Sequence, residues 1–227
     1  MSSAQPDARS LSSAERVSKR GARVVVVTGA TGDAGRATCA TLLAAGHSVV
    51  AVGSDADRLA TVPASARLVC NLADADATRQ LAARVRTEVG PADVLVHLVG
   101  GWRAGHGAED WDWLEPRILT TLRYATLAFV DDLGASSAGR LIAIGSTGAA
   151  KPTWSGANYA VLKSAAEAWL AAVASGWRKA GTGAVVELLV TSIGEDGTPV
   201  DRVANGILDA IGGDATELNG SRIDLTA

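Results

Sequence analysis

The sequence predicts a single α/β domain in three layers, with a doubly wound parallel sheet between two layers of helices. Apolar, β-branched runs such as 23–27 and 48–52 have the continuous hydrophobicity of strands that are buried on both faces. Segments of helical length separate these runs, as in a parallel sheet. The chain has 227 residues and no internal repeat, which suits one domain with a sizeable core.

The composition is that of an ordinary globular protein, with 48% hydrophobic and 20% charged residues. A net charge of −3 gives no reason to expect nucleic acid or an anionic membrane as a partner. No apolar run approaches the length of a membrane span, and the N-terminus lacks an apolar signal core, so we expect a cytoplasmic protein. Cys39 and Cys70 have no metal-ligand spacing, which predicts buried thiols and no metal site.

The N-terminal part contains the first sign of a ligand site. Residues 1–21, rich in Ser, Ala and charge, predict a mobile arm, with room for a short helix from Ser12 to Lys19, before a domain at 22–227. The first strand, 23–27, leads into Thr28-Gly29-Ala30-Thr31-Gly32-Asp33-Ala34-Gly35 and a helix to about Ala45. Such glycines let the backbone approach a pyrophosphate at the helix N-terminus, so the Asp33 carboxylate should point away.

Further strands and helices alternate along the rest of the chain. The predicted strands are 48–52, 67–70, 93–98, 139–144, 184–190 and 218–225. The predicted helices are 76–89, 112–131, a helix that carries Tyr159 and ends near Lys179, and 200–211. Pro116 fits the first turn of helix 112–131. The Tyr159 helix is rich in alanine and carries Trp169 and Trp177, which favours packing against another helix, as in a symmetric dimer.

An acid/base site is predicted at the end of strand 139–144. Ser146 follows this strand, and Tyr159 and Lys163 are four residues apart, which places them on one face of a helix. They supply a phenol proton donor, a cation that can lower its pKa, and a hydroxyl that can hold a substrate oxygen. Taken alone, the Tyr-x-x-x-Lys pair could also be a solvated helix face.

The spacing Ser146…Tyr159-x-x-x-Lys163, combined with the glycine loop, resembles the short-chain dehydrogenase/reductase family from about Arg23 to Leu225. The resemblance implies a Rossmann-like fold and an oxidoreductase. It also implies that Tyr159 donates a proton, that Lys163 lowers the pKa of Tyr159 and holds the nicotinamide ribose, and that Ser146 binds the substrate oxygen. The glycine spacing is that of extended or atypical members, since Asp33 replaces the middle glycine of the main branch.

The resemblance also implies a cofactor site. Its residues would be Gly29, Thr31, Gly32, Asp33, Ala34, Gly35, Ser54, Asn71, Leu72, Gly100, Tyr159 and Lys163. Gly53 stands where NAD-preferring relatives carry an acidic residue, and Ser54 could bind a 2′-phosphate with Arg58 nearby, although Asp55 is also close. We therefore expect NADP(H), with NAD(H) as the alternative. Asn71, at a position that often contacts the adenine, could equally be a turn residue.

Departures from the family pattern affect the substrate side. Trp102 and Trp154 flank the expected pocket and could stack on a flat or apolar substrate, or could be core or interface residues. We interpret His97 as a structural histidine rather than a proton carrier. Ile118 falls where main-branch members carry an asparagine that holds a relay water, and the segment after strand 184–190 is too short to cover the substrate.

These features together predict an enzyme that reversibly reduces a ketone or aldehyde with NADPH. The resemblance implies a homodimer or homotetramer with a small carbonyl or alcohol substrate. Two other classes stay open. One is a non-redox enzyme on the same fold, such as an epimerase, dehydratase or cyclase, and the other is a cofactor-binding protein without turnover. The sequence does not name the substrate.

Overall fold

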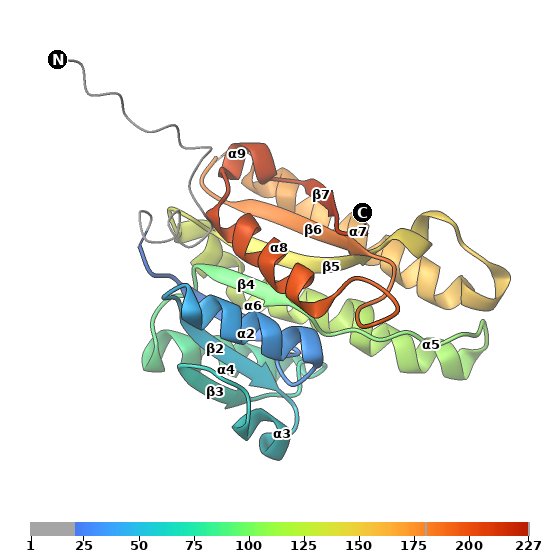
Figure 1. Ribbon diagram of the computed structural model, residues 1–227, viewed down its shortest axis with the longest axis horizontal. Helices are drawn as coiled ribbons and strands as arrows, with labels where there is room; N and C mark the ends of the chain where they lie inside the picture. Colours follow the sequence, from blue (N-terminus) through green and yellow to red (C-terminus); the bar gives the residue numbers. More distant parts are fainter. Residues whose placement is uncertain (1–20, 180, 227) are drawn as a thin grey trace.

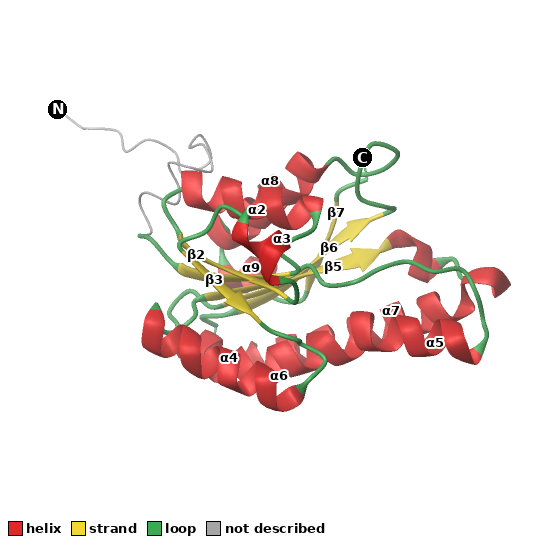
Figure 2. Ribbon diagram, turned by 90° about the horizontal axis from the view of Figure 1, so that it is seen from below, coloured by secondary structure: helices red, strands yellow, loops and turns green. Residues whose placement is uncertain are grey.

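The computed structural model describes residues 21–179 and 181–226, which form a parallel sheet between two layers of helices (Figures 1 and 2). The predicted arm, apart from Gly21, and the short helix considered between Ser12 and Lys19 lie outside the described residues. Among the described residues, no helix combines the length and apolarity needed to cross a bilayer.

The sheet has the order β3-β2-β1-β4-β5-β6-β7, and all its pairings are parallel. From β1 the chain winds outward through β2 and β3, then returns to place β4 beside β1 and winds the other way. This reversal confirms the predicted doubly wound fold and places a crevice at the carboxyl ends of β1 and β4. The strands are β1 (Val24–Thr28), β2 (Ser48–Gly53), β3 (Ala66–Val69), β4 (Val94–His97), β5 (Arg140–Ser146), β6 (Ala184–Val190) and β7 (Ser221–Asp224).

Each face of the sheet is covered by its own helices (Figure 2). One face carries α2 (Asp33–Ala44) and α8 (Val200–Gly212), and the other carries α4 (Ala75–Glu88), α6 (Thr121–Ala135) and α7 (Ala157–Trp177). Alternate residues of β1 enter the two cores: Val25 and Val27 pack on the α2 side, and Val26 packs on the α4 side. Burial on both faces explains why these strands are continuous apolar runs.

The helical segment before β5 differs from the prediction. It begins at α5 (Ala108–Glu115), passes through a π-helical turn (Pro116–Thr120) and continues as α6, so the predicted helix 112–131 is too short at both ends. Pro116 therefore lies well inside the segment rather than in its first turn. Proline lacks an N–H and its ring crowds the preceding turn, and the wide turn accommodates it, with the Thr121 N–H bonded to the Pro116 carbonyl.

Two short helices were not predicted, α3 (Ala56–Ala60) and α9 (Ala215–Leu218). Each is capped by an aspartate, and the Asp55 carboxylate accepts a hydrogen bond from the Arg58 backbone N–H at 2.9 Å. One turn is too short for apolar periodicity to appear, so only the cap residue signals such a helix.

The two cysteines are free and buried, as predicted. Burial raises the pKa of the Cys39 thiol to about 12 and raises the pKa of Cys70 as well. Trp169 and Trp177 pack against the core of their own chain, and the Arg123 guanidinium lies 5.3 Å from the centre of the Trp169 ring. These two tryptophans therefore leave the outer face of α7 to other side chains.

Candidate active site

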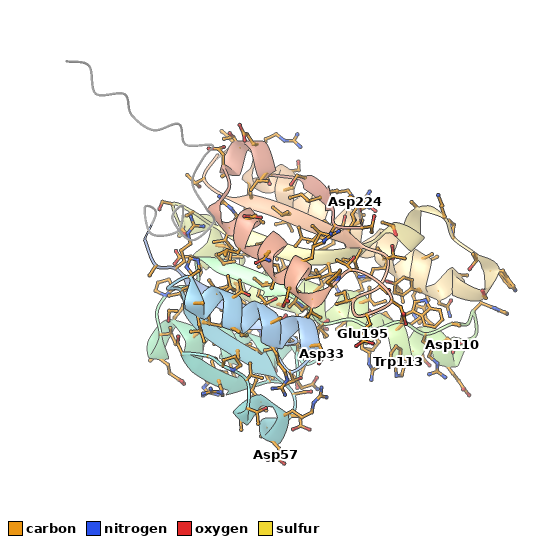
Figure 3. All side chains as sticks on the ribbon, in the orientation of Figure 1. Asp33, Asp57, Asp110, Trp113, Glu195 and Asp224 are labelled. Carbon is orange, nitrogen blue, oxygen red and sulfur yellow. The ribbon has the colours of Figure 1, made fainter. Side chains whose placement is uncertain are left out.

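The glycine loop after β1 fits an anion at the N-terminus of α2. Gly29 has φ +70°, and a Cβ there would lie 2.8 Å from the Leu98 backbone, so only glycine allows this approach to the chain after β4. Gly32 is the N-cap and offers no side chain to the first N–H groups of α2. These donors are free for a phosphate. Asp33, in the first turn, is exposed to solvent (Figure 3).

The structure brings Ser146, Tyr159 and Lys163 together. Ser146 is the last residue of β5 and is 4% exposed, and Tyr159 and Lys163 occupy the first two turns of α7. The Ser146 side chain is close enough to Tyr159 to oppose the rise that burial causes in the pKa of its phenol, and the Ser146 hydroxyl accepts a hydrogen bond from the Gly148 N–H at 3.2 Å. The Lys163 Nζ atom donates to the Ile144 carbonyl at 2.8 Å and lies 6.0 Å from the centre of the Tyr159 ring.

The tyrosine keeps its proton in this site. Burial raises the pKa of the Tyr159 phenol, and the nearby Ser146 hydroxyl opposes the rise. We expected Lys163 to lower the pKa of Tyr159, but its ammonium group bonds to the Ile144 carbonyl, and burial dominates at the phenol. A protonated phenol is the form that a general acid needs.

His97, a neutral histidine, lies near Lys163. Burial, together with the positive charge of Lys163, lowers the pKa of His97 to about 3. Its Nδ1 atom is 2.9 Å from the Thr28 hydroxyl, and its Nε2 atom is 3.4 Å from the Thr121 hydroxyl. Both ring nitrogens therefore have partners, which favours the structural interpretation over a proton carrier.

The three side chains lie on one wall of a cavity of about 690 Å³. Its other walls are residues 98–102 after β4, five residues between Gly148 and Gly156 before α7, and residues 190–193 at the end of β6 and beyond it. Trp102 lines the cavity and is 67% exposed, whereas Trp154 is not among the lining residues and stacks on His106 with ring centres 4.3 Å apart. The two tryptophans predicted to flank one pocket therefore have different surroundings.

Hydrogen bonds hold the loop that continues from the cavity-lining residues 98–102. The Gly105 N–H donates to the Ser155 carbonyl at 2.6 Å, and the Asn158 side-chain amide donates to the Gly107 carbonyl at 2.8 Å. Asp110, on α5, forms an ion pair with Arg103 at 2.9 Å (Figure 3). The loop after β4 is thus tied both to α5 and to the start of α7, the helix that carries Tyr159.

Two arginines gather at the end of β2. A Cβ at Gly53 would lie 2.8 Å from the Thr31 methyl group, so this position has little room for an acidic side chain. Arg58 donates to the Thr31 carbonyl at 3.2 Å, and Arg36 donates to the Arg58 carbonyl at 3.1 Å. Within the described chain, neither guanidinium forms an ion pair. Arg36 was not among the predicted cofactor residues, although its place directly after Gly35 was a usable signal.

The other predicted cofactor residues have distinct surroundings. Ser54 is exposed directly after β2, and Gly100 lines the cavity. The Asn71 side-chain oxygen accepts a hydrogen bond from the Ala73 N–H at 3.2 Å, which makes Asn71 a turn residue in this structure. Leu72 is 6% exposed and belongs to the core on the α4 side.

A family model described as short chain dehydrogenase matches residues 23–200. The chain belongs to the short-chain dehydrogenase family. Curated relatives include 2,3-dihydro-2,3-dihydroxybenzoate dehydrogenase of Bacillus subtilis, 28% identical over 63% of this chain and 60% of the relative. Acetoacetyl-CoA reductase of Cupriavidus necator is 28% identical over 67% of both chains. The match thus spans less than two thirds of the Bacillus relative's length.

Solved structures of short-chain dehydrogenases share the fold at low sequence identity. The NADPH-bound short chain oxidoreductase of Pseudomonas aeruginosa, which contains an atypical catalytic center, has a TM-score of 0.82 and 20% identity. It covers 89% of this chain, and 95% of its own length is matched. An actinorhodin polyketide ketoreductase with NADPH has a TM-score of 0.80 and 20% identity, over 90% of this chain and 96% of its own.

Proposed function

We propose that this short-chain dehydrogenase reversibly reduces a ketone or aldehyde with NADPH. The observation that supports this proposal is that Ser146, Tyr159 and Lys163 all line the cavity at the carboxyl ends of the strands. Loss of NADPH absorbance across a panel of carbonyl substrates tests the proposal. A chain that binds NADPH but consumes none with any member of the panel contradicts it.

The residues divide the reaction between them. The cofactor, when bound, supplies a hydride to the carbonyl carbon. The Ser146 hydroxyl holds the substrate oxygen, and the Tyr159 phenol, protonated because burial raises its pKa, gives its proton to that oxygen. The Lys163 ammonium stabilises the phenolate that remains and holds the nicotinamide ribose.

The chain's own groups fit a dinucleotide with a 2′-phosphate. The uncapped N-terminus of α2 offers donors to the pyrophosphate. Arg36, Arg58 and Ser54 lie at the end of β2, where the adenosine ribose binds in this kind of fold. The Asp55 carboxylate, which would repel the phosphate, is engaged as the cap of α3.

NADPH should therefore bind more tightly than NADH. Quenching of tryptophan fluorescence in parallel titrations measures both affinities. Arg36→Gln and Arg58→Gln should each weaken NADPH binding by about tenfold or more and leave NADH binding nearly unchanged, since a hydrogen bond to a charged group contributes about 1.5–3 kcal/mol. Arg84→Gln, on the exposed side of α4, is the matched control. Equal affinity for the two cofactors in the unmodified protein contradicts the preference.

A non-redox reaction is the second candidate, and Ile118 supports it. The residue is 3% exposed and packs in the core on the π-helical turn, so it cannot hold a relay water as asparagine would. An epimerase, dehydratase or cyclase would form product without net consumption of NADPH. Product analysis beside the absorbance assay separates these reactions from reduction, and separates both from a cofactor-binding protein without turnover.

We also propose a homodimer or homotetramer built on α6 and α7. Leu127 on α6 is 56% exposed and Val161 on α7 is 55% exposed, which is unusual for aliphatic side chains beside a well-formed core. Light scattering at micromolar concentration should give the mass of a dimer or tetramer. Val161→Glu should shift that mass toward the monomer, whereas Val69→Glu, at an exposed position on edge strand β3, should not. A monomeric unmodified chain contradicts the proposal.

A further inference from the structure

Glu187 is a buried acid in an otherwise apolar strand. It lies in the middle of β6, and the whole residue is 6% exposed. One carboxylate oxygen, Oε2, accepts a hydrogen bond from the Arg222 Nε atom on the neighbouring strand β7 at 2.8 Å. Buried carboxylates are rare because leaving water is costly, and they persist where charged partners stabilise them.

The other carboxylate oxygen, Oε1, is directed toward Gly145 on the neighbouring strand β5, a residue that lines the cavity. It lies so close to the Gly145 Cα atom that a Cβ at this position would collide with it. Gly145 follows Ile144, the residue whose carbonyl oxygen accepts the hydrogen bond from Lys163. The glutamate and the lysine therefore reach the same peptide of β5, and each charge opposes the effect of burial on the other group. Burial raises the pKa of Glu187, and the Lys163 ammonium acts against that rise after Arg222; burial lowers the pKa of Lys163, and the Glu187 carboxylate acts against that fall.

We propose that Glu187 is a positioning residue of the active site, the counter-charge that holds Lys163 as an ammonium ion although the lysine is removed from water. The chemical role of that ammonium rests on the proposed function, but the pairing itself does not. Burial lowers the pKa of Lys163 from 10.5 to about 8, and Glu187 opposes that shift. Without the carboxylate, the lysine would lose its charge at a lower pH.

The surrounding charges support this arrangement. The described charged groups that act on Glu187 are Arg222 on β7, and Glu167 and Lys163 on α7. Arg222 also forms an ion pair with Glu167 at 2.7 Å. Two acids and two bases thus balance. His97 and Tyr159 also face Lys163, and both are uncharged, since burial lowers the pKa of the imidazole and raises the pKa of the phenol. Removal of the Glu187 charge leaves an excess positive charge beside the lysine.

Titration of Lys163 by NMR tests the proposal without cofactor or substrate. The chain has four lysines, Lys19, Lys151, Lys163 and Lys179, so ¹³C-labelled lysine gives few signals, and Lys163→Met assigns the relevant one. In the unmodified protein the midpoint should lie near pH 8. In Glu187→Gln, which retains the shape of the side chain, it should fall by about one pH unit, as expected for the loss of a neighbouring opposite charge.

Glu167→Gln is the matched control, because this acid also pairs with Arg222 but does not act on Lys163. Its lysine midpoint should equal that of the unmodified protein. An unchanged midpoint in Glu187→Gln, or equal shifts in both variants, overturns the proposal. If Glu187→Gln does not fold, the carboxyl ¹³C chemical shift of Glu187 in the unmodified protein, followed as a function of pH, tests the pairing instead. This titration curve should show a second step at the Lys163 midpoint, and Lys163→Met should remove that step. A curve with a single step in the unmodified protein overturns the pairing.

Activity gives an independent measurement. With an accepted carbonyl substrate, the basic limb of the pH profile of kcat should move to lower pH in Glu187→Gln and stay in place in Glu167→Gln. Failure to find any substrate would count against the proposed function alone, since the NMR midpoints do not depend on turnover.

Discussion

Replacing Tyr159 by phenylalanine should lower turnover by about 10²–10⁴-fold, the usual contribution of a positioned general acid. The substitution keeps the aromatic ring against the core and removes only the hydroxyl that faces Ser146. Cofactor affinity should change little, because Lys163 holds the ribose in the proposed complex. Steady-state kinetics and a fluorescence titration of NADPH measure the two quantities.

Tyr124→Phe is the control for this experiment. Tyr124 is the other tyrosine of the chain and lies on α6, away from the cavity-lining residues. Its replacement should leave turnover near that of the unmodified enzyme. Full activity in Tyr159→Phe would contradict the proton-donor mechanism and would favour the non-redox reaction instead.

Replacing Lys163 by alanine should weaken cofactor binding and lower turnover together, because the ammonium acts on both the ribose and Tyr159. Affinity for NADPH should fall by about tenfold to a hundredfold, the equivalent of one hydrogen bond to a charged group.

The unmodified enzyme should show the same loss of NADPH affinity as a function of pH. Since the pKa of Lys163 is about 8, the amine is charged below that pH and neutral above it, so NADPH binding should weaken as the pH rises through 8.

Lys179→Ala, an exposed lysine beyond the end of α7, controls for loss of a positive charge from the same part of the chain. Because Lys163→Ala leaves the Ile144 carbonyl without its donor and leaves Arg222 as the cationic partner of Glu187, thermal unfolding should accompany the binding measurements. A folded Lys163→Ala variant that binds NADPH with normal affinity would contradict the proposed role of the lysine.

The layers of the fold were predictable because the buried strands are continuous apolar runs and the glycine loop marks the first β–α turn. The limits of helix 112–131 were not, because Pro116 resembles a first-turn proline and nothing local shows that a π-helical turn can hold it inside a longer segment. Helix α3 was missed for a different reason, since a single turn capped by Asp55 has no periodicity to read.

The candidate site was predictable only in part. The four-residue spacing of Tyr159 and Lys163 predicted that they share one face of a helix. The structure shows that Ser146 lines the same cavity as these two residues. The surroundings of Trp154 depend on the path of the loop after β4, which the sequence does not define. Glu187 left a usable signal, a lone acid inside the apolar strand 184–190, but its partner Arg222 is distant in the chain and only the sheet order brings the two together.

The turn between β6 and α8 has a consequence for how reactants are exchanged. Only residues 191–199 separate the two elements, and this segment is closed by hydrogen bonds between Gly194 and Thr198 and between Thr198 and Ser192. A turn that short and that well bonded is unlike a mobile lid, so release of product would depend on its own affinity for the cavity rather than on the opening of a loop. Tyr159 lines the cavity and is only partly buried, so in the proposed reaction solvent that enters the cavity could return the proton to the phenol without a buried relay through position 118.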